Sequence, residues 1–189
     1  MIPIDQFGRP KLSRLQPRAD IHPSQVALIP LVKRTPAASF LFCGANGSGK
    51  THIAWALYRA ALARRRPAFG CSLNQLLRQY RDWELMSHDE RVAAQRDRTR
   101  RRPMVLPEDL HSAAKHTLFI DEFEKAGVTE FTSRMLYELV NNARDFGHQL
   151  IITSNKDWNQ LREHWSRTDE VYGNSIMTRL KCCVLIEMF

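Results

Sequence analysis

The stretch Gly44-Ala45-Asn46-Gly47-Ser48-Gly49-Lys50-Thr51 decides the fold of this chain. It satisfies the pattern G-x-x-x-x-G-K-[ST], follows an apolar run at residues 39–43, and precedes an amphipathic segment at residues 50–65. The glycines allow successive backbone N–H groups to turn towards phosphates, and a helix that begins near Lys50 directs its positive end at the same charge. Lys50 can reach the β- and γ-phosphates, and the Thr51 hydroxyl can bind Mg²⁺. The stretch therefore predicts a site for a nucleoside triphosphate.

Polar residues follow two later apolar runs and could bind a metal ion or take part in hydrolysis at this site. Residues 117–120 lead into Asp121, and a strand that ends in an acid delivers the carboxylate that holds Mg²⁺ beside the phosphates. The adjacent Glu122 can orient and deprotonate a water molecule, which a kinase would not need. Residues 149–153 lead to Asn155, which would face the γ-phosphate if this strand lies beside the first. Asn155 could then hold the attacking water or sense the phosphate.

Short apolar runs alternate with helical patterns along most of the chain. Strands are predicted at residues 39–43, 68–72, 117–121, 149–153 and 182–187. Helices are predicted at residues 50–65, 73–83 and 132–146, with one more that ends at residues 178–180. This alternation predicts an α/β fold, a five-stranded, mostly parallel sheet flanked by helices, with ligands bound at the carboxyl ends of the strands.

The N-terminal part of the chain differs in composition, because it is rich in proline. Six of the nine prolines lie in residues 1–36, and their spacing predicts an irregular arm with a short extended piece near residues 26–32. Residues 37–189 are predicted to form one domain, which can bury a core without disulfides or structural metal. The four cysteines lie in apolar runs, so we expect buried thiols in a reducing cytoplasm rather than zinc ligands.

The chain is basic. It carries 28 Lys and Arg against 20 Asp and Glu, a formal net charge of +8, which favours a polyanionic partner. No apolar run approaches the ~18 residues of a membrane span. Residues 87–103 form a basic insertion that is interpreted either as a solvated loop or as a contact with the DNA backbone. Tyr80 and Trp83 could stack on bases, although their helical spacing favours packing. The arginines of the insertion are Arg91, Arg96, Arg98, Arg100, Arg101 and Arg102.

Four segments, in this order, resemble those of AAA+ ATPases, and most closely those of DnaC-type helicase loaders and IstB-type transposition ATPases. They are residues 43–54, 118–122, 151–155 and 175–180, and the resemblance covers roughly residues 40–187. It implies a P-loop NTPase fold of the AAA+ ASCE type that binds ATP and Mg²⁺. The nucleotide contacts that it implies are Gly44, Ala45, Asn46, Gly47, Ser48, Gly49, Lys50, Thr51 and His52.

The same resemblance implies roles for single residues. Lys50 and Thr51 belong to the Walker A motif, Asp121 and Glu122 to Walker B, and Asn155 to sensor 1. The metal ligands would be Thr51 and Asp121, and the catalytic residues Lys50, Glu122, Asn155 and Arg179.

Arg179 matches an arginine finger, which acts on the nucleotide of a neighbouring subunit. Such proteins assemble as oligomers on DNA when ATP is bound, and they deliver a replicative helicase to single strands or direct a transposase to its target. The loaders have a substantial N-terminal helicase-binding domain, whereas here we expect only the irregular arm of residues 1–36 before the first strand. We also expect no C-terminal lid domain after the last strand.

Other P-loop classes share the first motif. The sequence Asn155-Lys156-Asp157 resembles the N-K-x-D of GTPases, but Trp158 occupies the position that needs the aspartate, so we reject this class. A small-molecule kinase stays the alternative from another class, because many kinases have this size and this loop. Glu122 beside the metal-binding acid argues against a kinase, and more weakly against an adaptor that binds nucleotide without hydrolysing it.

Overall fold

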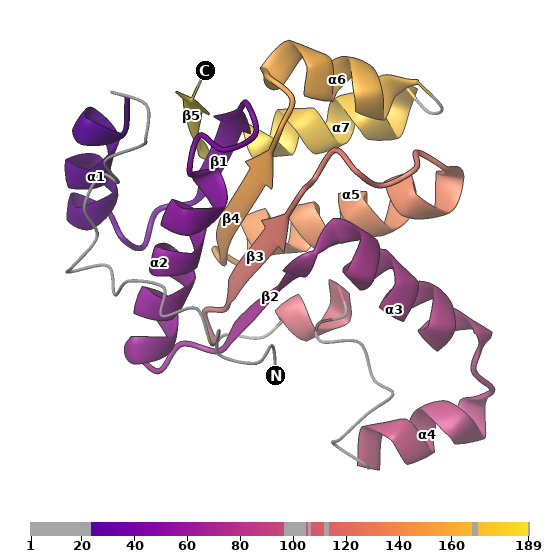
Figure 1. Ribbon diagram of the computed structural model, residues 1–189. Helices are drawn as coiled ribbons and strands as arrows, with labels where there is room; N and C mark the ends of the chain where they lie inside the picture. Colours follow the sequence, from indigo (N-terminus) through magenta and orange to yellow (C-terminus); the bar gives the residue numbers. More distant parts are fainter. Residues whose placement is uncertain (1–23, 97–104, 106, 112–113, 168–169, 189) are drawn as a thin grey trace.

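The core of the protein is a five-stranded parallel sheet, seen in a computed structural model that describes residues 24–96, 105, 107–111, 114–167 and 170–188 (Figure 1). The strand order is β2-β3-β4-β1-β5, and every neighbouring pair is parallel. In the register of β1, Phe40 lies opposite Ile151 of β4 on one side and opposite Val184 of β5 on the other. The strands are β1 (Phe40–Gly44), β2 (Ala68–Ser72), β3 (Thr117–Asp121), β4 (Gln149–Ser154) and β5 (Val184–Met188).

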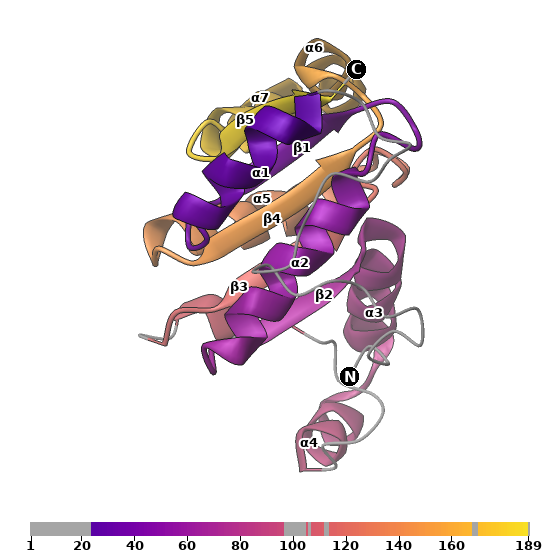
Figure 2. The same cartoon turned by 60° about the vertical axis from the view of Figure 1, so that its left-hand side comes forward.

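The helices form two layers, one on each face of the sheet (Figure 2). The side chains of each strand pack alternately against the two layers, because successive side chains of a strand point to opposite faces. Phe40 and Phe42 join the cluster under α1 and α2, whereas Leu41 and Cys43 join the cluster under α3, α5, α6 and α7. The main helices are α1 (Ser24–Arg34), α2 (Lys50–Ala63), α3 (Leu73–Leu85), α4 (His88–Arg96), α5 (Glu130–Asp145), α6 (Trp158–Ser166) and α7 (Glu170–Leu180).

The predicted α/β fold class is confirmed, and the predicted strands agree with the observed ones to within two residues at each end. The strand at Gln149–Ser154 lies directly beside β1, the arrangement on which the proposed role of Asn155 depended. The last strand begins at Val184 rather than at Cys182. Cys182 is therefore exposed in the preceding turn, and its expected burial is wrong, while the other three cysteines are buried.

The extended piece predicted near residues 26–32 is also wrong, because this segment lies within α1. The helix tolerates Pro30, which costs about 3 kcal/mol in a helix interior. Leu28, Ile29 and Val32 are buried in the cluster that contains Phe40, and each such side chain contributes about 1.5–3 kcal/mol. The packing energy therefore exceeds the cost of the proline, and α1 shares a core with the sheet. Residues 1–23 of the predicted arm lie outside the described residues.

The basic insertion begins with a helix rather than a loop. Arg91 of α4 donates hydrogen bonds to the backbone oxygens of Trp83, at 3.0 Å, and Glu84, at 2.7 Å. This arginine therefore ties α4 to the end of α3. Tyr80 and Trp83 are buried, as their spacing favoured. Arg98, Arg100, Arg101 and Arg102 lie outside the described residues. In the part of the chain that is described, no helix has the length and hydropathy of a membrane span.

Gly173→Ala tests the close packing of α6 on α7. A Cβ atom at Gly173 would lie 2.4 Å from the backbone oxygen of Trp165 and 2.6 Å from its carbonyl carbon. We expect the free energy of unfolding to fall by about 2–4 kcal/mol, because two backbones must separate. The measurement is urea denaturation, with Gly127→Ala as the control, since a Cβ at Gly127 meets nothing within 4 Å. Similar midpoints for the two variants would contradict this packing.

Candidate functional site

The loop between β1 and α2 leaves the N-terminus of α2 open. Gly47 and Gly49 have φ angles of 82° and 90°, a left-handed conformation that favours glycine. Gly49 caps α2 without a side-chain hydrogen bond, and the first turn of the helix contains no acidic residue. Side chains do cap other helices, among them Ser72 for α3, Thr129 for α5 and Asp157 for α6. The first N–H groups of α2 are therefore oriented for an anion in the loop.

Lys50 is buried at the start of α2, and its ammonium group is held by the loop itself. It donates hydrogen bonds to the backbone oxygens of Gly44, at 2.8 Å, and Ala45, at 2.6 Å, and to the Ser48 hydroxyl at 3.4 Å. Burial lowers the pKa of Lys50, while the nearby carboxylates of Glu124 and Asp121 act in the opposite direction. The lysine charge therefore lies in the loop that was predicted to bind phosphates.

The Asp121 carboxylate joins three segments of the site. Its Oδ1 atom accepts hydrogen bonds from the Thr51 hydroxyl, at 3.1 Å, and from the Thr153 hydroxyl. The strand order makes this possible, since β4 lies between β1 and β3 and all three carboxyl ends meet at one edge. Hydroxyl and carboxylate oxygens are hard donors of the kind that Mg²⁺ prefers. The chemistry and proximity of Thr51 and Asp121 therefore fit the predicted metal site.

Glu122 has a constrained backbone and a side chain that is already paired. Its φ angle is 56°, which is uncommon for a residue other than glycine. Its N–H donates a hydrogen bond of 3.1 Å to the Thr153 hydroxyl, which holds this conformation. The carboxylate forms an ion pair of 2.5 Å with Lys125, and both side chains are partly exposed. This contact raises the pKa of Lys125.

Asn155 lies just beyond β4, beside the loop that follows β3. Its amide nitrogen donates a hydrogen bond of 2.7 Å to the Glu124 carboxylate. Glu124 also lies close enough to Lys50 to affect the pKa of the lysine. Asn155 is thus brought to the same edge of the sheet as Lys50 and Asp121, as its position after β4 predicted. The other loop residues, including His52 in the first turn of α2, are exposed or half-buried.

Arg179 is held away from this cluster by a different set of contacts. It lies in the last turn of α7 and donates hydrogen bonds to the Asn141 side chain at 2.7 Å and to the Tyr137 hydroxyl at 2.9 Å. Its guanidinium carbon also lies 4.3 Å from the centre of the Tyr137 ring. The structure therefore docks Arg179 on α5 of its own chain, and no described contact joins it to the phosphate loop.

Three residues of this site were not singled out from the sequence. Thr153 connects Asp121 and Glu122, Lys125 pairs with Glu122, and Glu124 holds Asn155. A threonine at the end of a strand that neighbours Asp121 was a usable signal, because parallel strands present their ends together. The partners of Glu122 and Asn155 lie in an irregular turn, whose side-chain directions no periodic pattern predicts.

The site and the fold define a class of protein. Residues 40–175 match the family described as "ATPase family associated with various cellular activities (AAA)". The match covers more than half of the chain, and the chain belongs to this family. It is therefore a nucleotide-binding ATPase of the AAA type, which confirms the predicted family and its ASCE sheet. A search of curated proteins found no match.

Several solved structures share the fold at low sequence identity. DnaI has 18% identity and a TM-score of 0.70, with 96% of this chain and 92% of the other covered. The DnaC helicase loader has 15% identity and a TM-score of 0.65, with coverages of 95% and 96%. DnaA from Aquifex aeolicus has 16% identity and a TM-score of 0.61, but this chain covers only 49% of it. These similarities show that the chain shares the fold of these proteins.

Replacement of Thr153 tests its position between the two acids. Thr153→Val removes the hydroxyl at constant shape, so Asp121 loses a donor and the Glu122 N–H loses its acceptor. We expect the free energy of unfolding to fall by about 1–3 kcal/mol and ATP turnover to fall about 10–100-fold. Thr153→Ser, the matched control, should retain most of the turnover. Equal turnover in the valine and serine variants would show that the hydroxyl does not position the acids.

Proposed function

We propose that this chain is a DNA-associated AAA+ ATPase that assembles as an oligomer and loads or recruits a client protein on DNA. The observation that carries the proposal is the hydrogen bonding of Thr51 and Thr153 to Asp121, which gathers the candidate metal ligands beside the phosphate loop. The similarity in fold to the DnaC helicase loader and DnaI, over more than nine-tenths of each chain, supports a role in DNA replication. A transposase is the other client that the sequence resemblance implies.

Nucleotide would bind across the loop at residues 44–51, with Mg²⁺ held by Thr51 and Asp121. When bound, Mg²⁺ neutralises phosphate charge. Lys50 would exchange its contacts with the oxygens of Gly44 and Ala45 for phosphate oxygens, which are stronger acceptors for an ammonium group. Two structures of DnaA share this fold, one described as bound to AMPPCP and the other as bound to AMPPCP and single-stranded DNA. They support ATP and single strands as ligands here.

Hydrolysis would use Glu122 as the base for water and Asn155 as the residue that holds the water or senses the phosphate. Both are paired in the structure, Glu122 with Lys125 and Asn155 with Glu124. The contact with Lys125 lies at the surface, where water screens the attraction between the two charges, so Glu122 can exchange it for another partner. Membership in the AAA family argues against the small-molecule kinase, which needs an acceptor site instead of a base for water.

Two substitutions separate nucleotide binding from chemistry. Lys50→Ala removes the buried charge and should weaken ATP binding strongly, whereas Glu122→Gln keeps the shape and should bind ATP normally. The glutamine variant should hydrolyse ATP about 10²–10⁴-fold more slowly, because it cannot accept a proton. Calorimetry gives the affinities and phosphate release gives the rates. Wild-type affinity in Lys50→Ala would refute the phosphate site, and a wild-type rate in Glu122→Gln would refute the assignment of the base.

Arg179 tests the oligomer. If it reaches the γ-phosphate of a neighbouring subunit, Arg179→Ala should bind ATP almost normally but lose about 10³–10⁵ in rate. Mixing Arg179→Ala with Lys50→Ala should restore activity, because one variant supplies an intact pocket and the other an intact arginine. If Arg179 only holds α7 on α5, through Asn141 and Tyr137, the mixture will stay inactive although mixed oligomers form. The readout is phosphate release at several ratios of the two variants.

A further inference from the structure

Basic residues gather at the edge of the sheet opposite to the nucleotide site. Each lies where a helix or loop ends and the next strand begins, so all of them lie at the amino ends of parallel strands. The end of α1 precedes β1, the end of α2 precedes β2, and a short loop precedes β3. This group, the amino-edge patch, consists of Lys33, Arg34, Arg64, Arg65, Arg66 and Lys115.

Direct contacts connect the parts of the patch. Arg64 donates a hydrogen bond of 3.3 Å to the backbone oxygen of Pro36, which joins the end of α2 to the segment after α1. The Thr117 N–H donates to the oxygen of Pro67 at 2.9 Å, which joins the start of β3 to the segment after Arg66. Lys115 donates to the oxygen of Phe146, at the end of α5. The segments that carry the basic residues therefore lie next to one another.

The charges of the patch have no acidic partners in the described part of the chain. No described carboxylate forms a salt bridge with Lys33, Arg34 or Arg65, and all three side chains are exposed. Asp145, an acid near this edge, is engaged by Arg144 at 2.8 Å. Positive charges that are grouped and unpaired repel one another, and an anionic ligand would remove this cost.

Arg65 shows that the patch is not explained by helix stability alone. It occupies the residue after the C-cap of α2, where the Arg65 and Arg66 N–H groups bond back to the oxygens of Leu62 and Ala61. Helices that end in this way usually have glycine there, because φ is positive, and φ of Arg65 is 58°. A cation does favour a helix C-terminus, but Arg64 already supplies one. Arginine therefore occupies a position at which the positive φ angle favours glycine.

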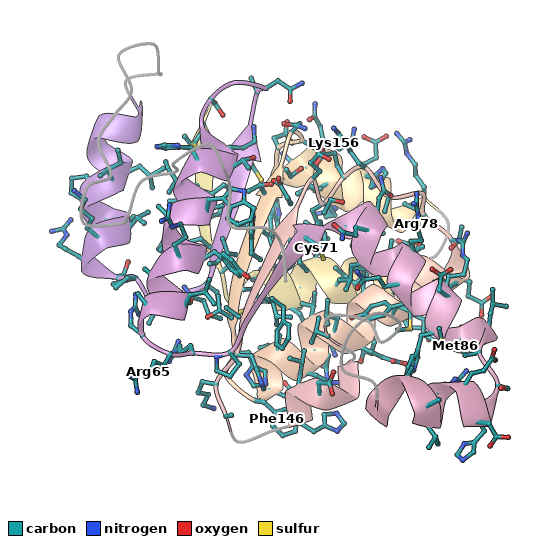
Figure 3. The ribbon with its side chains drawn as sticks, turned by 60° about the horizontal axis from the view of Figure 1, so that its bottom comes forward. Arg65, Cys71, Arg78, Met86, Phe146 and Lys156 are labelled. Atoms are coloured by element: carbon teal, nitrogen blue, oxygen red, sulfur yellow. The ribbon has the colours of Figure 1, made fainter. Side chains whose placement is uncertain are left out.

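An exposed aromatic pair lies on the same edge. Phe146 is 38% exposed, and its ring stacks on the ring of His111 with centroids 5.2 Å apart. Figure 3 shows Arg65 and Phe146 on the same lower side of the molecule, with Lys156, which follows β4, at the opposite end. Guanidinium groups suit phosphates, and exposed aromatic rings suit unpaired bases. Together they fit single-stranded nucleic acid better than an acidic protein or a membrane.

We propose that the amino-edge patch binds the phosphate backbone of single-stranded nucleic acid, with Phe146 as a stacking platform for a base. This inference rests on the proposed function only in its choice of DNA as the physiological ligand. It assigns the contact to residues outside both the nucleotide site and the basic insertion. Because the patch and the nucleotide site lie at opposite edges of the sheet, both can be occupied together.

The first experiment measures binding of a labelled oligothymidine by fluorescence anisotropy at several salt concentrations. The variant Lys33→Gln/Arg34→Gln/Arg65→Gln removes three charges that form no described hydrogen bond. The slope of log affinity against log salt should fall by about 2, at roughly 0.7 for each phosphate that is no longer neutralised. The control Arg78→Gln/Arg162→Gln/Arg167→Gln makes the same change in net charge on α3 and α6 and just beyond α6, and should leave the slope near that of the wild type. Equal slopes for the two triple variants would overturn the proposal.

Arg65→Gly separates a binding role from a structural one. Glycine relieves the positive φ, so the melting temperature should rise while the affinity for oligothymidine falls. Arg65→Lys should retain most of the affinity. Loss of affinity together with loss of thermal stability would indicate a structural role and would overturn the assignment of Arg65.

Phe146→Leu should weaken oligothymidine binding about tenfold without changing the salt slope, because it removes stacking and no charge. Binding of the same variants to phosphatidylserine vesicles tests whether the patch binds an anionic membrane instead. If the triple variant loses vesicle binding but keeps oligothymidine binding, the patch is a membrane surface and the proposal fails. If only the variant Arg98→Gln/Arg100→Gln/Arg101→Gln/Arg102→Gln loses the salt slope, the insertion is the DNA contact and the proposal also fails. ATP affinity, measured on each variant, reports the nucleotide site independently.

Discussion

The hydrogen bonds that Thr51 and Thr153 donate to Asp121 hold the site together, and they depend on the order of the strands. β4 lies between β1 and β3, so the loop after β1 and the acids after β3 are brought to the two sides of Thr153. All the strands are parallel, so their polar ends meet at one edge and the buried centre of the sheet needs no polar side chains to align them. A shift of β4 by one residue would move Thr153 to the other face and remove its hydrogen bond to Asp121.

The main polar groups of the site have partners within the described part of the chain, but the buried Oε2 atom of Glu124 has no hydrogen bond there. Lys50 is held by carbonyl oxygens, Glu122 by Lys125, and Asn155 by Glu124. Burial of Lys50 without such acceptors would be costly, because an ammonium group loses its hydration. In the proposed function, binding of a triphosphate would replace the contacts of Lys50 with the backbone oxygens of Gly44 and Ala45.

The sequence predicted the parts of this molecule that local pattern determines. The phosphate loop, the five strands and the position of Asp121 follow from short motifs and from the alternation of apolar runs. The helix at Ser24–Arg34 was not predicted, because its proline argues locally against a helix. The packing of Leu28 and Val32 in the core stabilises the helix, and this tertiary contact is not visible in the local sequence. The pairing of Glu122 with Lys125 and the docking of Arg179 on Tyr137 depend on rotamers and on helix packing, which a single sequence does not contain.

Helix α2 connects the two edges of the sheet physically. Its 14 residues span about 21 Å, at about 1.5 Å per residue, from the phosphate loop at Lys50 to the basic segment that begins at Arg64. Its dipole favours an anion at the first end, where the first turn contains no acidic residue, and cations at the second end, where Arg64 and Arg65 lie. Nucleotide and nucleic acid would then contact opposite ends of one rigid element. Any effect of one ligand on the affinity of the other must be reciprocal, because both effects express a single coupling free energy.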